Sequence, residues 1–133
     1  MKKLLRFQTG FGAAMLLLAA LFSAEMLSAQ VQTFTASGTF TVPVGVTDVT
    51  VECWGGGGRG STRTSTGVGG GGGGGAYARK VISVFSGGTY TITVGAGSTT
   101  TAAGGDSWFG NATLVMAKGG NSASDNSSTG AAG

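Results

Sequence analysis

Apolar and polar residues alternate along several short stretches of this chain. The clearest alternation covers residues 47–54, TDVTVECW. One face of this stretch carries Val49, Val51 and Cys53, and the other face carries polar side chains. Successive side chains of a β-strand point to opposite faces, so the pattern predicts a strand with one buried face.

Further short stretches are rich in Val, Thr, Ile and aromatic residues and are bounded by turn residues. They cover residues 31–34, 39–42, 76–85, 89–94, 107–109 and 113–117. Ser37 and Gly38 predict a turn between the first two, and the sequence Ser-Gly-Gly at 86–88 predicts a hairpin between 76–85 and 89–94. Helical periodicity is missing after residue 29. We therefore predict an all-β fold, a small antiparallel β-sandwich or jelly-roll-like module.

The glycine residues follow the predicted strands. Of 28 glycines, two fall within the first 29 residues, which leaves 26 in the remaining 104. The glycine stretches at 55–58, 95–97 and 119–120 directly follow predicted strands, and the run at 69–75 directly precedes one. A flexible spacer would have no reason to respect strand ends, so we expect the glycine segments to be part of the fold.

Polyproline II geometry suggests how such segments become ordered, because it leaves an extended backbone with no internal hydrogen bonds. Segments without side chains approach closely enough to exchange N–H···O=C bonds, with Cα–H···O contacts as a weaker supplement. We predict a side-by-side, polyglycine-II-like bundle anchored at both ends by the sheet. The alternative is disordered loops, since ordering glycine is costly. The structural and interaction candidates are Gly55, Gly56, Gly57, Gly58, Gly69, Gly70, Gly71, Gly72, Gly73, Gly74, Gly75, Trp54, Trp108 and Tyr77.

The first 29 residues have the pattern of an export signal. Lys2, Lys3 and Arg6 form a basic start, and residues 11–22 are uncharged and largely apolar. Small residues before position 30 predict cleavage between Ala29 and Gln30. An uncleaved membrane anchor is the alternative, but the apolar run of 12 residues is shorter than the roughly 20 needed to span a bilayer.

We therefore expect export, with Gln30 rather than a lipidated cysteine at the new N-terminus and no membrane span in the mature chain. The predicted domains are a signal peptide (1–29), a glycine-rich β domain (30–120) and a low-complexity stretch (121–133) that continues in a longer chain. We expect a bacterial protein that is secreted or associated with the cell surface.

Charge and composition exclude several function classes. Removing the leader leaves five bases and four acids, a balance that argues against nucleic-acid binding. The cations around the glycine runs are expected to be solubilising rim charges, with acidic polymers or phosphates as the alternative partners. They are Arg59, Arg63, Arg79 and Lys80.

The chain contains no histidine, which excludes Ser-His-Asp and Cys-His catalysis. No phosphate-binding loop is predicted either, because the long glycine run leads into a strand and lacks the Lys-Ser/Thr of that motif. Asp106 is expected to bond backbone amides in a turn rather than a cation. We therefore predict no enzyme activity, no cofactor and no metal.

Cys53 and the aromatic residues each allow two interpretations. The unpaired Cys53 is expected to be a small buried residue, with an intermolecular disulfide as the alternative. The four aromatics Trp54, Tyr77, Tyr90 and Trp108 lie at or near predicted strand ends and are expected in the core. Their alternative role is to stack on sugar rings.

Several motifs resemble the bacterial and phage glycine-rich domain of exported surface proteins and tail-associated adhesins. The resemblance covers residues 34–120, and its distinctive motifs are VECWGG at 51–56, GAYA at 75–78, YTITVG at 90–95 and GGDSWFG at 104–110. It implies a β-sandwich-like module with protruding glycine-rich loops used in surface attachment or as a structural element. Members often form one module of a longer chain.

Two functions remain as expectations. The first is a non-catalytic surface or adhesion module whose glycine-rich loops contact a surface receptor, a glycan or a neighbouring surface protein. The second is a carbohydrate-binding module attached to an enzyme or anchor domain beyond residue 133.

Overall fold

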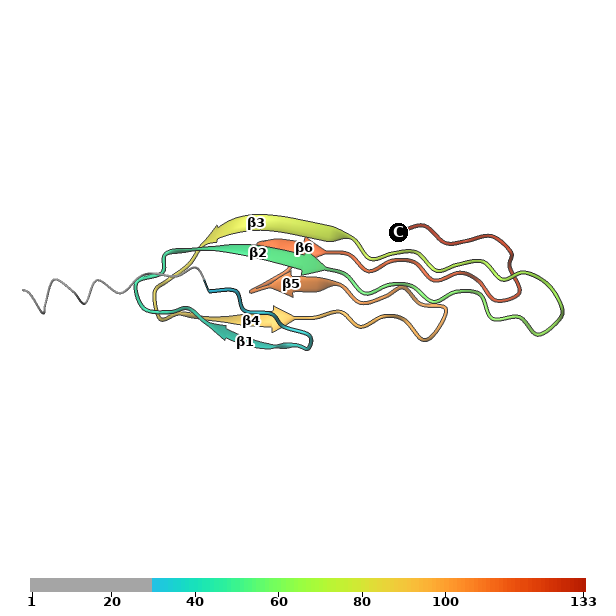
Figure 1. The fold of residues 1–133 in the computed structure, drawn as a ribbon, viewed down its shortest axis with the longest axis horizontal. Coiled ribbons are helices and arrows are strands. Elements are labelled where there is room, and N and C mark those ends of the chain that lie inside the picture. The colour runs from blue at the N-terminus through green and yellow to red at the C-terminus, as the bar shows by residue number, and fades with distance from the viewer. Residues whose placement is uncertain (1–29) are drawn as a thin grey trace, which may run out of the picture. The chain divides into compact units, whose positions relative to one another are not determined.

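A computed structural model describes residues 30–133, of which residues 33–133 form one compact unit. The predicted leader, residues 1–29, lies outside the described part. Within the unit the chain forms strands and irregular segments but no helix, which confirms the all-β prediction (Figure 1). The strands are β1 (Gly38–Thr41), β2 (Asp48–Trp54), β3 (Tyr77–Ser83), β4 (Thr89–Thr93), β5 (Ser107–Phe109) and β6 (Val115–Ala117).

The strands form two antiparallel sheets. One sheet has the order β1-β4-β5-β6, and the other pairs β2 with β3. The two sheets contact each other, with β2 on β5 and β6, and β3 on β6. This arrangement is the small antiparallel β-sandwich that the alternation predicts.

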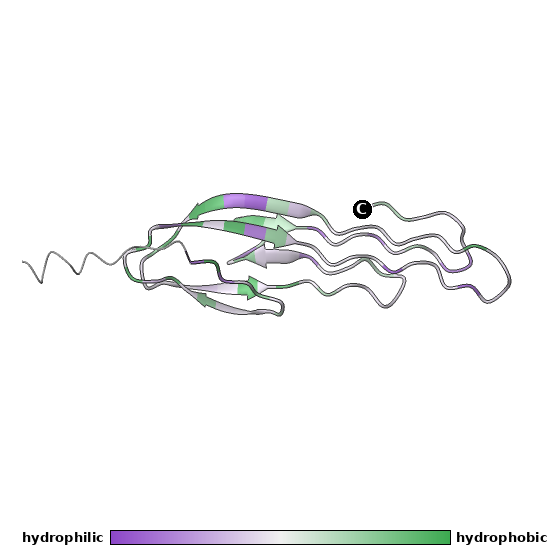
Figure 2. Ribbon diagram, viewed as in Figure 1, coloured by the Kyte–Doolittle hydropathy of each residue, from purple (hydrophilic) through white to green (hydrophobic). Residues whose placement is uncertain are grey.

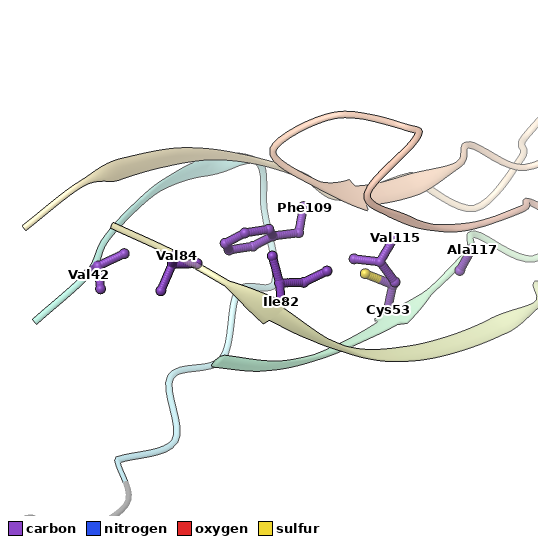
Figure 3. Close-up of a cluster of buried hydrophobic side chains, with 7 residues drawn as sticks. All are labelled: Val42, Cys53, Ile82, Val84, Phe109, Val115 and Ala117. Atoms are coloured by element: carbon purple, nitrogen blue, oxygen red, sulfur yellow. The ribbon is translucent and has the colours of Figure 1, made fainter. Parts of the chain in front are cut away.

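Apolar side chains from both sheets fill the core. In β2, Val49, Val51 and Cys53 face inward as predicted. Figure 3 shows the buried side chains gathered between the strands of the two sheets. They are Val42, Cys53, Ile82, Val84, Phe109, Val115 and Ala117. Tyr90 stacks on Phe109 with ring centroids 4.8 Å apart, so this tyrosine belongs to the core, as expected.

Cys53 confirms the prediction of a small buried residue. Its side chain is 8% exposed, and burial raises the pKa of its thiol. A buried, protonated thiol reacts poorly with other thiols, which argues against the intermolecular disulfide.

The predicted hairpin between 76–85 and 89–94 is wrong. The chain does turn at Ser86–Gly88, where Gly87 has a φ of 73°, but β3 and β4 lie in different sheets. Gly87 donates a backbone hydrogen bond to Val42, which ties this turn to the end of β1. The turn therefore carries the chain from one sheet to the other, so that the inner faces of β3 and β4 line the same core from opposite sides.

Residues 31–34 form no strand, contrary to prediction, and Gly38 begins β1 instead of closing a turn. The Phe34 ring packs edge-on against Phe40 at 6.5 Å. The Oγ of Ser37 accepts a hydrogen bond from the Val94 N–H. This segment is thus held by side-chain contacts rather than by strand pairing.

The strands β2, β4 and β6 all run toward the same end of the sandwich and continue there into glycine-rich segments (Figure 1). Figure 2 shows that hydrophobic residues gather on the strands, while little of the glycine-rich part is hydrophobic. The two halves of the unit therefore depend on different interactions.

Candidate functional site

Six glycine-rich segments lie side by side beyond the strands (Figure 1), and we refer to them together as the bundle. Segment I follows β2 and segment II leads into β3; segments III and IV connect β4 to β5; segments V and VI follow β6. Their residues are 55–62 (I), 69–76 (II), 95–98 (III), 103–106 (IV), 118–124 (V) and 127–133 (VI). Residues 121–133 therefore belong to the same unit as the strands.

Backbone hydrogen bonds join neighbouring segments at every third residue. Segment I donates to segment II at distances of 2.8–2.9 Å. The donors are Gly55, Gly58 and Ser61, and the acceptors are Ala76, Gly73 and Gly70, respectively. A spacing of three residues matches the three residues per turn of polyproline II. The bonds confirm the predicted side-by-side bundle.

Segment I lies at the centre of this network. Its carbonyl groups at Gly56, Arg59 and Thr62 accept hydrogen bonds from segment V and the loop after it, again three residues apart. The donors are Gly120, Ala123 and Asn126. Segment I also bonds to segment IV through Gly56 and to segment III through Gly57. Four neighbouring segments therefore hold it in place.

The bundle uses glycine because of space, not because of an unusual φ. Positive φ values occur at Gly67 within the glycine-rich loops, but not at Gly55–Gly58 or Gly69–Gly75. A Cβ on Gly58 would overlap the Asn121 carbonyl, and a Cβ on Gly73 would overlap that of Ala132. The segments are closer together than a methyl group allows.

The outer side of segment II is an exception. A Cβ on Gly71 or Gly74 would meet nothing within 4 Å. Val68, Gly71, Gly74 and Tyr77 follow one another at intervals of three residues and are all exposed, and we call these four residues the open ridge. Glycine is not required for space along this ridge.

The sheet anchors the bundle at one end only, so the prediction of anchoring at both ends is wrong. Close to the sheet, Asp106 accepts hydrogen bonds from Lys118 Nζ at 2.8 Å and from the Gly119 N–H at 2.9 Å. These two bonds lower the pKa of the Asp106 carboxyl. Asp106 thus bonds a backbone amide, as predicted, although it does so on a neighbouring segment instead of in its own turn.

Side chains of two loops close the far end of the bundle. Loop 62–68 joins segments I and II, and loop 124–127 joins segments V and VI. Asp125 in the second loop pairs with the Arg59 guanidinium and accepts the Thr62 N–H at 3.0 Å. The hydrogen bond from Arg59, together with that from Thr62, lowers the pKa of the Asp125 carboxyl.

Asn126 completes this connection. Its carbonyl accepts a hydrogen bond from Arg63 Nη1 at 2.6 Å, and its side-chain Oδ1 accepts the Thr64 N–H at 2.9 Å. Its φ of 58° lies in the left-handed region, which asparagine tolerates well. Arg59 of segment I and Arg63 of loop 62–68 therefore both bond to loop 124–127, contrary to the prediction that they are solubilising charges.

The predicted core position is wrong for Trp54 and Tyr77. They face each other across β2 and β3 on the outer side of the sheet, with ring centroids 5.3 Å apart. Trp54 is 62% exposed and Tyr77 is 52% exposed. The neighbouring pair, Glu52 and Arg79, forms an ion pair at 3.2 Å. Partial desolvation and the Glu52 carboxylate raise the pKa of the Tyr77 phenol.

Trp108 and Lys80, the remaining candidate residues, contact groups outside the exposed Trp54–Tyr77 pair. Trp108 in β5 is half-buried and pairs with Met116 of β6, away from the Trp54–Tyr77 pair. Lys80 donates a hydrogen bond to the Leu114 carbonyl at 3.0 Å. Trp108 therefore lies outside the core, contrary to prediction, and in the other sheet from the exposed aromatic pair.

Two kinds of site are absent from residues 30–133. No three His, Cys, Asp or Glu side chains are grouped there in a way that would hold a metal ion. Those residues also form no helix long and apolar enough to cross a membrane.

Comparison with known proteins gives one result. The search of curated proteins and of solved structures found no match. The family model of the glycine-rich domain matches residues 33–133, which include both the sandwich and the bundle. Because this match covers most of the chain, the protein belongs to the glycine-rich domain family.

Proposed function

We propose that this protein is an exported, non-catalytic interaction module that binds a surface partner through the loops at the far end of its bundle. The observation that carries this proposal is that Asp125 and Asn126 bond loop 124–127 to loop 62–68, while Asp125 also pairs with Arg59 of segment I. Loops that are already ordered lose less conformational entropy when they bind a partner. The exposed Thr64, Ser65 and Thr66 would supply hydroxyl groups for recognition.

The bundle supports this proposal as well. Backbone bonds between its segments fix the direction in which the loops leave the sandwich. A rigid support holds binding residues more precisely than a flexible linker does. The sequence pattern of residues 1–29 supports export, and the missing histidine supports a non-catalytic role.

Matched threonine substitutions test the proposal. Thr66 lies in loop 62–68, and Thr99 lies in the separate loop between segments III and IV; both are exposed. Labelled protein is applied to an array of bacterial surface proteins, glycans and cell-wall preparations. We expect Thr66→Arg to lose the binding of the wild-type protein and Thr99→Arg to retain it. Equal binding by the two variants would contradict the proposal.

The exposed Trp54–Tyr77 pair favours carbohydrate binding as a second candidate function. Aromatic rings at a protein surface stack on the apolar faces of sugars, and Glu52 and Arg79 next to them offer hydrogen-bonding groups. On a glycan array, Trp54→Ala is expected to lose sugar binding, while Trp108→Ala keeps it. Binding that depends on Trp108 instead, or that survives Trp54→Ala, would contradict this candidate.

A further inference from the structure

The open ridge has backbone groups without partners in addition to free space. Among residues 30–133, the N–H groups of Gly71 and Gly74 have no hydrogen-bond partner. The adjacent Gly72 and Gly75, whose Cβ positions would meet segment I instead, have N–H and C=O groups without partners as well. The ridge thus resembles the edge of a β-sheet, where free N–H and C=O groups offer a template for another chain. Unlike most protein surfaces, it has no side chains at Gly71 and Gly74 to prevent close approach.

The other sides of segment II show what kind of chain fits against it. Segment I lies antiparallel to segment II, with bonds at every third residue. Segment VI bonds to it through the Ala131 N–H and the Gly71 carbonyl at 2.9 Å. Glycine-rich segments therefore pack against the other sides of segment II through backbone hydrogen bonds. The open ridge continues this established packing on a free side.

We propose that two copies of this protein associate through the open ridge, antiparallel to each other around a twofold axis. A twofold contact requires a surface that is complementary to itself. In the antiparallel register that places Gly71 opposite Gly74 of the second copy, Val68 falls opposite Tyr77. The ridge and the adjacent Gly72 and Gly75 carry both donors and acceptors, so each copy supplies what the other lacks.

The two ends of the ridge strengthen this pairing. Val68 is 77% exposed, and Tyr77 and Trp54 form an exposed aromatic pair. The proposed register buries Val68 of one copy on the aromatic pair of the other, twice in each dimer. Burial of these apolar surfaces favours association. The backbone hydrogen bonds between the copies add less free energy, because they replace hydrogen bonds to water.

Two exposed valines provide a matched test of this contact. Val68 lies on the ridge, while Val44, which is 88% exposed, lies in the sandwich between β1 and β2. In sedimentation velocity, the wild-type mass is expected to rise toward that of a dimer with increasing concentration. Val68→Lys is expected to remain a monomer, and Val44→Lys to behave like the wild type. A monomer at every concentration, or an equal effect of both substitutions, would overturn the proposal.

The register has its own test. The double variant Val68→Cys with Tyr77→Cys is expected to form covalent dimers on mild oxidation, because each new cysteine lies opposite the other in the second copy. Within one chain the two positions are about 28 Å apart at the 3.1 Å rise of polyproline II, too far for a disulfide. The control is Val44→Cys with Tyr77→Cys, and equal dimer yields from both variants would overturn the register. Neither experiment contains a glycan or surface partner, so failure here leaves the proposed function untouched.

Discussion

The sandwich and the bundle are stabilised in opposite ways. In the sandwich, side chains such as Phe109 and Ile82 fill the space between two sheets. In the bundle, the lack of side chains at residues such as Gly58 and Gly73 allows backbones to meet. The sandwich therefore loses stability when atoms are removed, and the bundle loses stability when atoms are added. This contrast can be tested one residue at a time.

The largest effect is expected in the sandwich. Phe109 is 4% exposed, and its ring stacks on Tyr90 in the core. Phe109→Ala leaves a cavity there, and such truncations lower the free energy of unfolding by about 3–5 kcal/mol. Urea denaturation measures the loss. The control is Phe85→Ala, since Phe85 is 83% exposed; an equal loss from both substitutions would contradict the described core.

A smaller effect is expected from adding one methyl group to the bundle. Gly73→Ala places a Cβ on the Ala132 carbonyl, and overpacking of this kind costs about 1–3 kcal/mol. At Gly74 the same substitution meets open space. Gly74→Ala is expected to be neutral or to stabilise by up to about 1 kcal/mol, because alanine lowers the entropy of the unfolded chain. Urea denaturation of both variants separates the two positions, and equal losses would refute the bundle packing.

The smallest effect on stability is expected at the far end of the bundle. The contact between Asp125 and the Thr62 amide there depends on pH. Because the pKa of Asp125 is lowered in the folded state, its contribution is present above the pKa of an unfolded aspartate. It is lost as the pH falls through the lowered value. We expect the Thr62 amide to lose protection over that range in NMR-detected exchange. Asp125→Asn should remove this pH dependence, and an unchanged profile would contradict the assignment.

The sequence predicts where the strands lie better than it predicts which strands pair with each other. Alternation identifies β2 and its inward face correctly, because side-chain direction is a local property. It does not say which strand lies beside β3, and the short turn at Ser86–Gly88 suggested β4. The glycine runs likewise predict a bundle, but identical glycines hide the difference between Gly73, which is packed, and Gly74, which is open.

The candidate site was harder to predict because its contacts join distant residues. Arg59 and Asp125 are 66 residues apart, and no local pattern connects them. The exposure of Trp54 and Tyr77 depends on what covers the outer side of a two-stranded sheet, and residues 30–133 place no third layer there.

Amide hydrogen exchange along segment II tests most directly whether backbone bonds between segments hold the bundle together. At a concentration where the protein is monomeric, we expect slow exchange at Gly70, Gly73 and Ala76, whose N–H groups donate to neighbouring segments. Gly71 and Gly74 should exchange rapidly, which would give a pattern with a period of three. Uniformly rapid exchange from Gly69 to Gly75 would show that the segments are not bonded to each other, and would contradict the account.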